Sequence, residues 1–179
     1  MEFNDVINKR TSVRSYEKIP VIKENMARIL EASMLAPSWK NKASYKFIIV
    51  EDMEKKELLS KTILNDTQNT ELAIKEAPLT AIIVANPKES GVVVGKEYYL
   101  VDSAIAMEHL ILAATNEGYG TCWIGAFDED KIREIFSIPS DYRVVGMTPV
   151  GISNEETEQH HKKEIAEHVY LDNWEQSYC

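Results

Sequence analysis

The stretch "VDSAIAMEHLILAATNEGYG", residues 101–120, is the most informative part of the chain for its architecture. Almost every position from Asp102 to Asn116 is apolar or small, so the pattern predicts a helix with apolar residues on most of its surface. Asp102 is the predicted N-cap and Gly118 the predicted C′ residue. Such a helix needs burial on most sides, and the sequence therefore predicts a central or interface helix.

Strand patterns lie on both sides of this helix. "YKFIIVE" (45–51) and "LTAIIVA" (79–85) are apolar and β-branched, which predicts buried strands, and the chain between them favours one or two polar helices. After the helix, "TCWIGAF" (121–127) predicts a strand or strand end, "DEDKIREIFSI" (128–138) a short helix with Asp128 at its cap, and "YRVVGMTPVGI" (142–152) another strand. The mixed order, with few βαβ units, predicts an α+β fold.

The remaining segments complete this plan. A short helix is predicted from Phe3 to about Arg10, and a second with apolar positions from Ile22 to Met34, ended by Pro37. The C-terminal residues are charged, with scattered apolar side chains. Since no internal repeat or linker is visible, residues 1–179 are predicted to form a single domain.

Composition excludes several classes of function. The 20 basic and 29 acidic residues give a net charge of -9, which argues against nucleic acid or an anionic membrane surface as the main partner. No apolar run is long enough to cross a bilayer, and the N-terminus lacks a secretion signal. The 2 cysteines, Cys122 and Cys179, cannot build a disulfide framework, so a cytoplasmic location is predicted. The 4 histidines lack metal-ligand spacing, and no metal site is predicted.

One basic cluster stands out in this acidic chain. Within "NKRTSVRSYEKIPV" (8–21), Arg10 and Arg14 offer charged planar donors, and Thr11 and Ser12 add hydroxyls and backbone amides. This set suits one phosphate monoester. Basic residues are also favoured at helix C-termini by the helix dipole, and the spacing alone leaves both interpretations open.

Two further stretches carry possible chemistry. The loop "PSWKN" (37–41) offers small residues, an aromatic plane and an amide that could hold a polar heterocycle, or it is an ordinary connection with Trp39 as a surface anchor. In "EGYGTCWIGAFD" (117–128), glycines allow close approach of the backbone to another group, or simply cap a helix and interrupt a strand.

Taken together and in this order, "RTSVRSY", "APSWKNKASYKFIIV" and "GYGTCWIGAFD" resemble the FMN-dependent nitroreductase family over nearly the whole chain. The resemblance implies a three-layer α+β sandwich, with a mostly antiparallel central sheet flanked by helices. It also implies an interlocked homodimer with FMN sites at the interface.

The resemblance assigns roles to individual residues in three groups. The first group would meet the FMN phosphate, ribityl chain and pyrimidine edge, the second would reach the flavin from the partner chain, and the third would lie beside the isoalloxazine. They are Arg10, Thr11, Ser12 and Arg14; Pro37, Ser38, Trp39 and Asn41; and Trp123, Ile124, Gly125 and Ala126. The backbone amide of Gly125 or Ala126 would donate to flavin N5.

Other positions match the family less closely. Lys162 matches one member of a C-terminal basic pair, and His160 would replace the other. Asn69 or Thr70 would hold the pyrimidine ring. The family's Asn-x-Gln-Pro-Trp is here "NKASY", so Ala43 and Ser44 stand where the family has Gln and Pro.

The implied function is an FMN-dependent oxidoreductase that passes hydride from NADH or NADPH through flavin N5 to nitroaromatics, quinones or similar small electrophiles. The chemistry belongs to the flavin, so no catalytic side chain is expected; Cys122 is the alternative chemical centre and is interpreted as an inert core thiol. Two alternatives remain. One is a flavoenzyme of the same fold with another acceptor, namely a dehalogenase, an enoate reductase or a flavin-fragmenting enzyme. The other is a non-enzymatic flavin-binding protein.

Overall fold

The computed structural model describes residues 1–64, 68–156 and 164–178. Helices and strands alternate irregularly along the chain. The helices are α1 (Phe3–Lys9), α2 (Lys23–Met34), α3 (Met53–Ser60), α4 (Gln68–Glu76), α5 (Tyr98–Asn116) and α6 (Glu129–Phe136), with short 3-10 turns η1 (Trp39–Asn41) and η2 (Ile165–Glu167). The strands are β1 (Tyr45–Val50), β2 (Leu79–Ala85), β3 (Val92–Val93), β4 (Lys96–Glu97), β5 (Gly120–Thr121) and β6 (Arg143–Gly151).

The main sheet has the strand order β1-β2-β6-β5, and each neighbouring pair is antiparallel. Strands β3 and β4 form a separate two-stranded hairpin immediately before α5. This arrangement confirms the predicted α+β class and the mostly antiparallel sheet.

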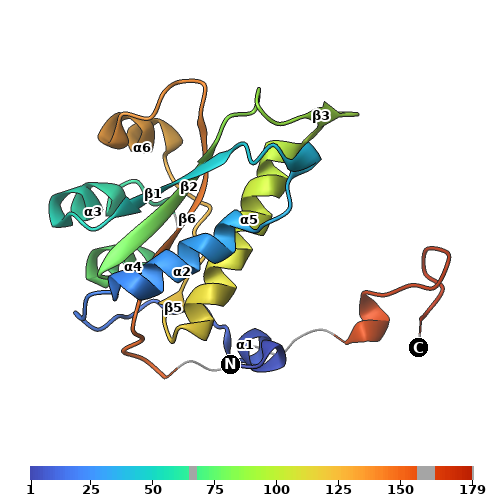
Figure 1. Ribbon diagram of the computed structural model, residues 1–179, viewed down its shortest axis with the longest axis horizontal. Helices are drawn as coiled ribbons and strands as arrows, with labels where there is room; N and C mark the ends of the chain where they lie inside the picture. Colours follow the sequence, from blue (N-terminus) through green and yellow to red (C-terminus); the bar gives the residue numbers. More distant parts are fainter. Residues whose placement is uncertain (65–67, 157–163, 179) are drawn as a thin grey trace.

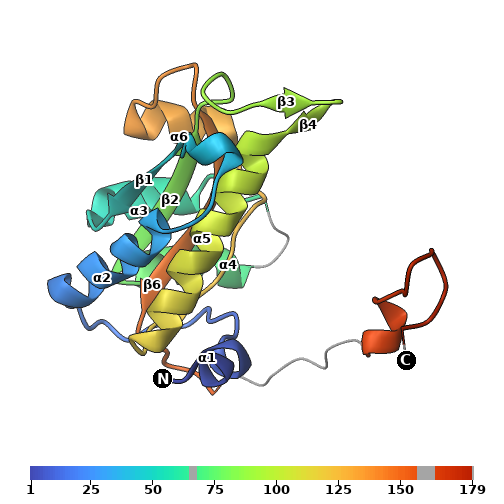
Figure 2. The ribbon, with the colours of Figure 1, turned by 45° about the vertical axis from the view of Figure 1, so that its right-hand side comes forward.

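The sheet is covered by helices on both faces (Figures 1 and 2). Alternate residues of β2 point to opposite faces: Ile83 packs in the cluster that contains Met107 and Leu110 of α5, whereas Ile82 packs with Leu59 of α3 and Ile132 of α6. Every residue of β2 is therefore buried, which explains why its sequence in an antiparallel sheet is apolar at every position except Thr80. These layers form the predicted three-layer sandwich.

The long helix differs from its predicted form at one end. It begins at Tyr98, and Glu97 occupies the N-cap position. Asp102, the predicted cap, lies one turn inside the helix and is 1% exposed. At the other end Gly118 has φ +88°, in agreement with its predicted position after the helix. The cap prediction failed because the carboxylate of Asp102 bonds groups distant in sequence instead of the helix's own amides.

The segment predicted as a strand over 121–127 is mostly irregular. Only Thr121 belongs to β5, and single bridges then pair Ile124 with Met147 and Phe127 with Ile63. In the helix that follows, Asp128 is the N-cap as predicted, because its carboxylate accepts a hydrogen bond from the amide of Lys131 at 3.2 Å.

The last described segment, residues 164–178, projects away from the sheet and helices in both views (Figures 1 and 2). Contacts within this segment include a ring contact between Tyr170 and Trp174 and a hydrogen bond from the amide of Leu171 to the carbonyl of Gln176. Trp174 is 81% exposed. The single-domain assignment for residues 1–179 stays a prediction. Among the described helices, none combines the length and the apolar character that a membrane crossing requires.

Candidate functional site

The basic segment after α1 lies beside the edge strand β5. The amide of Val13 donates to the carbonyl of Thr121 at 2.8 Å, and Ser12 and Thr121 form a parallel bridge. Val13 is buried against Gly120, where an added Cβ would approach Val13 Cγ2 to 2.6 Å. Buried Val13 therefore anchors the segment, while Arg14 on one side remains exposed and Ser12 on the other is half-buried.

A carboxylate already occupies backbone donors of this segment. Glu155 Oε1 accepts hydrogen bonds from the amides of Arg14 at 2.6 Å and Ser15 at 3.3 Å. The two amides therefore form an anion-binding turn. Sequence reasoning missed Glu155, because it lies in an acidic stretch after β6 and only the pairing of Tyr16 with Ser153 brings it here.

The segment 122–126, which contains the predicted residues Trp123, Ile124, Gly125 and Ala126, runs from β5 along β6. The amide of Cys122 donates to Thr148 Oγ1 at 3.0 Å, and Ile124 exchanges backbone hydrogen bonds of 2.9 and 3.0 Å with Met147. Between these anchors the Trp123 side chain is 41% exposed and passes over Gly146, where a Cβ would approach the indole to 3.0 Å.

Beyond Ile124 the backbone turns outward. Gly125 and Ala126 are exposed, and in the part of the chain that the structure describes, their amides donate no hydrogen bond. A Cβ at Gly125 would meet only Trp123 Nε1, at 3.4 Å. Two free backbone donors thus lie on an open surface, where they can bind an acceptor on another molecule.

The basic segment 10–14 and the segment 122–126 meet at Cys122. Its side chain is 5% exposed, and burial raises the pKa of the thiol; Arg14, a hydrogen bond from Ser12 and Arg10 oppose that rise, while Glu155 adds to it. The thiol is therefore protonated at neutral pH and is a poor nucleophile. Because Arg10, Ser12 and Arg14 all act on this thiol, the polar groups of the basic segment lie close to Cys122.

The predicted loop 37–41 lies near the N-terminal end of α5. The amide of Trp39 donates to Asp102 Oδ1 at 2.7 Å, and its indole stacks on Tyr98 with ring centroids 4.0 Å apart. Trp39 is half-buried, whereas Pro37 and Asn41 are exposed. The loop is thus anchored through Trp39, and its flanking residues face solvent.

A single chain does not bring this loop to the basic segment. Thr11 lines a small cavity with Thr115 and Gly118 at the C-terminal end of α5, whereas Trp39 contacts Asp102 near the N-terminal end. The helix rises about 1.5 Å per residue, so these points lie roughly 20 Å apart along it. Residues 10–14 and 122–126 come together in this chain, and residues 37–41 do not join them.

The remaining predicted residues are placed in part. Asn69 is exposed in the first turn of α4 and Thr70 is buried. The chain just before α4 approaches residues 122–126, since the amide of Leu64 donates to the carbonyl of Ala126 at 3.1 Å. Lys162 and His160 lie outside the described residues. Within the described ranges, no cluster of His, Cys, Asp and Glu could hold a metal ion.

The chemistry of these donors fits FMN. Two guanidinium groups and two hydroxyls suit a phosphate, and the amides of Gly125 and Ala126 suit a ring nitrogen. Gly125 keeps the approach to these amides open.

The fold and this arrangement place the chain among α+β proteins with an anion-binding turn beside the sheet edge. Residues 7–152 match the model of the nitroreductase family, and the chain belongs to that family. A nitroreductase family protein from Clostridium novyi NT is 47% identical, with 99% of this chain and 97% of that chain covered and a TM-score of 0.84.

Two other relatives carry more specific names. A structure from Clostridium difficile R20291, described as an FMN-dependent nitroreductase, is 30% identical, covers 96% of this chain and 99% of its own, and has a TM-score of 0.84. A Methanothermobacter thermautotrophicus protein with the provisional name NADH dehydrogenase/NAD(P)H nitroreductase is 31% identical over 84% of this chain and 77% of its own length.

Proposed function

We propose that this protein is an FMN-dependent oxidoreductase that uses NADH or NADPH to reduce nitroaromatics, quinones or similar small electrophiles. The observation that carries the proposal is the convergence of the basic segment and residues 122–126 across the Val13–Thr121 hydrogen bond of 2.8 Å. Membership of the nitroreductase family and the description of the C. difficile relative as an FMN-dependent nitroreductase support it.

The chain's own residues would bind and orient the cofactor. Arg10 and Arg14 would neutralise the phosphate, with Thr11 and Ser12 donating beside them. The amide of Gly125 or Ala126 would donate to N5 of the ring, and Trp123 and Ile124 would shape the wall behind it. When bound, FMN supplies the hydride-accepting and hydride-donating centre.

We also propose that the site is shared between two copies of this chain. Pro37, Ser38, Trp39 and Asn41 of one copy would approach the flavin held by the other, because within one chain they lie at the far end of α5. Exposed apolar side chains next to this loop support pairing: Leu35, which precedes the loop, is 80% exposed, and Val101, next to Asp102 on α5, is 48% exposed. The projecting segment 164–178 carries further exposed apolar side chains, among them Ile165 and Trp174.

The experiment is an equilibrium titration of the flavin-free protein with FMN. Wild type should bind FMN, and Arg10→Ala should bind it about tenfold to a hundredfold more weakly, because a charge-assisted phosphate contact is worth roughly 1.5 to 3 kcal/mol. Lys88→Ala, which removes an exposed positive charge elsewhere, is the matched control and should bind like wild type. A folded wild-type protein that binds no FMN would refute the proposal.

A further inference from the structure

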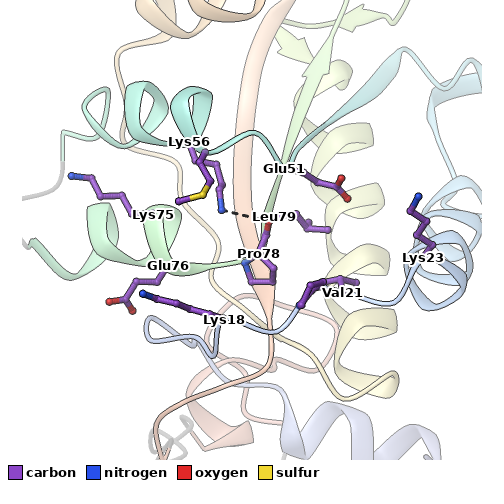
Figure 3. Close-up of a pocket in the computed structure, with 11 residues that line it drawn as sticks. Lys18, Val21, Lys23, Glu51, Lys56, Lys75, Glu76, Pro78 and Leu79 are labelled. Carbon is purple, nitrogen blue, oxygen red and sulfur yellow. Dashed lines mark hydrogen bonds between the residues drawn. The ribbon is translucent and has the colours of Figure 1, made fainter.

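One cavity of the described chain shares no residue with the segments assigned to the flavin. It has a volume of about 600 Å³ and opens between residues 18–23, the start of α3 and the connection from α4 to β2 (Figure 3). Its lining residues include four lysines, Lys18, Lys23, Lys56 and Lys75. An acidic protein has thus gathered positive charge around one hollow.

Lys56 is the unusual member of this group. It is 5% exposed, and its ammonium donates to the carbonyls of Ala77 at 2.6 Å and Pro78 at 3.5 Å. Both acceptors are uncharged, and an ammonium has three donors. Removal from water lowers the pKa of Lys56, and no neighbouring charge of the described chain offsets that effect. A buried positive charge without a counter-charge is costly, and an anion in the cavity would compensate it.

The other charges show what kind of anion fits. Lys75 is already paired, since its Nζ lies 3.3 Å from Glu57 outside the cavity wall. Two carboxylates also line the cavity, Glu51 on the side of Lys23 and Glu76 on the side of Lys18 (Figure 3). With these carboxylates nearby and no arginine in the wall, a doubly charged phosphate would be poorly matched. A single negative charge placed at Lys56 would be favoured.

The rest of the wall is apolar. Val21, Met53, Pro78 and Leu79 line the cavity near Lys56, so a ligand with a charged end could bury a hydrocarbon body against them. We propose that this cavity binds a small monocarboxylate with an aromatic or branched aliphatic body, its carboxylate paired with Lys56 and its body against the apolar wall. This site is separate from the flavin site and does not rest on its assignment.

Benzoate is the probe, and full-length wild-type protein is titrated with it by calorimetry and by amide NMR. Benzoate should bind and shift the amide signals of Met53, Val21 and Leu79. Benzyl alcohol, which has the ring without the charge, should bind at least about tenfold more weakly, since the charge-assisted contact is lost.

Two variants separate Lys56 from a general lysine effect. Lys56→Met keeps the length of the side chain and removes the ammonium, and it should weaken benzoate binding about tenfold to a hundredfold. Lys75 lines the same cavity, but its ammonium is already paired with Glu57. The affinity of Lys75→Met for benzoate should therefore lie within about threefold of the wild-type affinity. If Lys56→Met does not fold, the NMR shifts of wild type decide alone.

The proposal is overturned if benzoate leaves the amide signals around the cavity unchanged. It is equally overturned if wild type binds benzyl alcohol as tightly as it binds benzoate. The same holds if Lys56→Met binds benzoate with the affinity of wild type. FMN content is recorded in every sample, so a protein that binds FMN but not benzoate rejects this site and leaves the flavin assignment intact.

Discussion

The carboxylate of Asp102, 1% exposed in the middle of the fold, accepts a hydrogen bond of 2.7 Å from the amide of Trp39, 63 residues away in sequence. Its other oxygen accepts a hydrogen bond from Ser90 Oγ at 3.1 Å. One side chain thus joins the loop 37–41, the segment before the β3–β4 hairpin and α5. This contact holds the loop that we propose approaches the flavin bound by the other copy of the chain.

Asp102→Leu should loosen this loop, because it leaves the Trp39 amide and the Ser90 hydroxyl without their acceptor. The expected loss of stability is about 1 to 3 kcal/mol, with faster hydrogen exchange at residues 37–43. Asp102→Asn can still accept from the Trp39 amide and donate to Ser90, and it should preserve most of the protection. Glu108→Gln, an exposed carboxylate on the same helix, is the control. Equal exchange in Asp102→Leu and wild type would show that the contact does not hold the loop.

Gly125→Val should separate flavin binding from folding. A Cβ at this position meets only Trp123 Nε1 at 3.4 Å, so the unfolding midpoint of the flavin-free protein should change little. The branched side chain would instead cover the free amides of Gly125 and Ala126 and weaken FMN binding steeply. Thermal melts of the flavin-free protein and FMN titrations measure the two effects. Normal FMN affinity in Gly125→Val would remove this segment from the site.

Cys122→Ala should retain most of the oxidoreductase activity. Burial raises the pKa of this thiol, so it is protonated at neutral pH, and the substitution removes only a small buried group at a cost of about 1 to 2 kcal/mol. Activity with a nitroaromatic and a quinone is measured beside FMN content. A variant with full FMN and no activity would indicate thiol chemistry.

Because Lys56 is buried, we expect the free energy of unfolding to depend on pH in the alkaline range. Its folded pKa lies below the ordinary value of 10.5, because burial disfavours the charged form. Between the folded pKa and 10.5 the unfolded chain binds the extra proton, so the free energy of unfolding should rise with pH in that window. Relative to wild type, Lys56→Met should lack this rise in denaturant titrations across alkaline pH. Parallel curves for the two proteins would mean that Lys56 titrates normally.

Much of this architecture was predictable because it depends on local patterns. The strands around Ile48 and Ile82 are β-branched and apolar, and Asp128 and Gly118 occupy helix ends with the geometry that their residue types favour. The start of α5 was not predictable, because Asp102 bonds a distant loop. Lys56 likewise lies in a charged stretch that is typical of a surface helix, and only the packing of α3 against the α4–β2 connection buries it.

The candidate site divides in the same way. The basic segment could be found from Arg10 and Arg14, because such charge is conspicuous in an acidic chain. Glu155 and Thr148 could not be found, since strand pairing alone brings them to Arg14 and Cys122.

Mixed dimers test whether each site is shared. Asn41 has φ +56° and its amide bonds the carbonyl of Ser38, so Asn41→Pro should disrupt the loop. Dimers of Arg10→Ala alone or Asn41→Pro alone should lose FMN affinity. Dimers with one chain of each variant should recover half the wild-type FMN content, because one site then contains both intact segments. No recovery in the mixed dimer would show that each site belongs to one chain.

The most direct test of the flavin assignment is anaerobic reduction of the purified, FMN-loaded protein, followed by the visible absorbance of the flavin. NADH or NADPH should bleach that absorbance, and a nitroaromatic or a quinone added afterwards should restore it, with Cys122→Ala behaving like wild type. Bound flavin that stays oxidised in the presence of both nicotinamides would contradict the proposed oxidoreductase function.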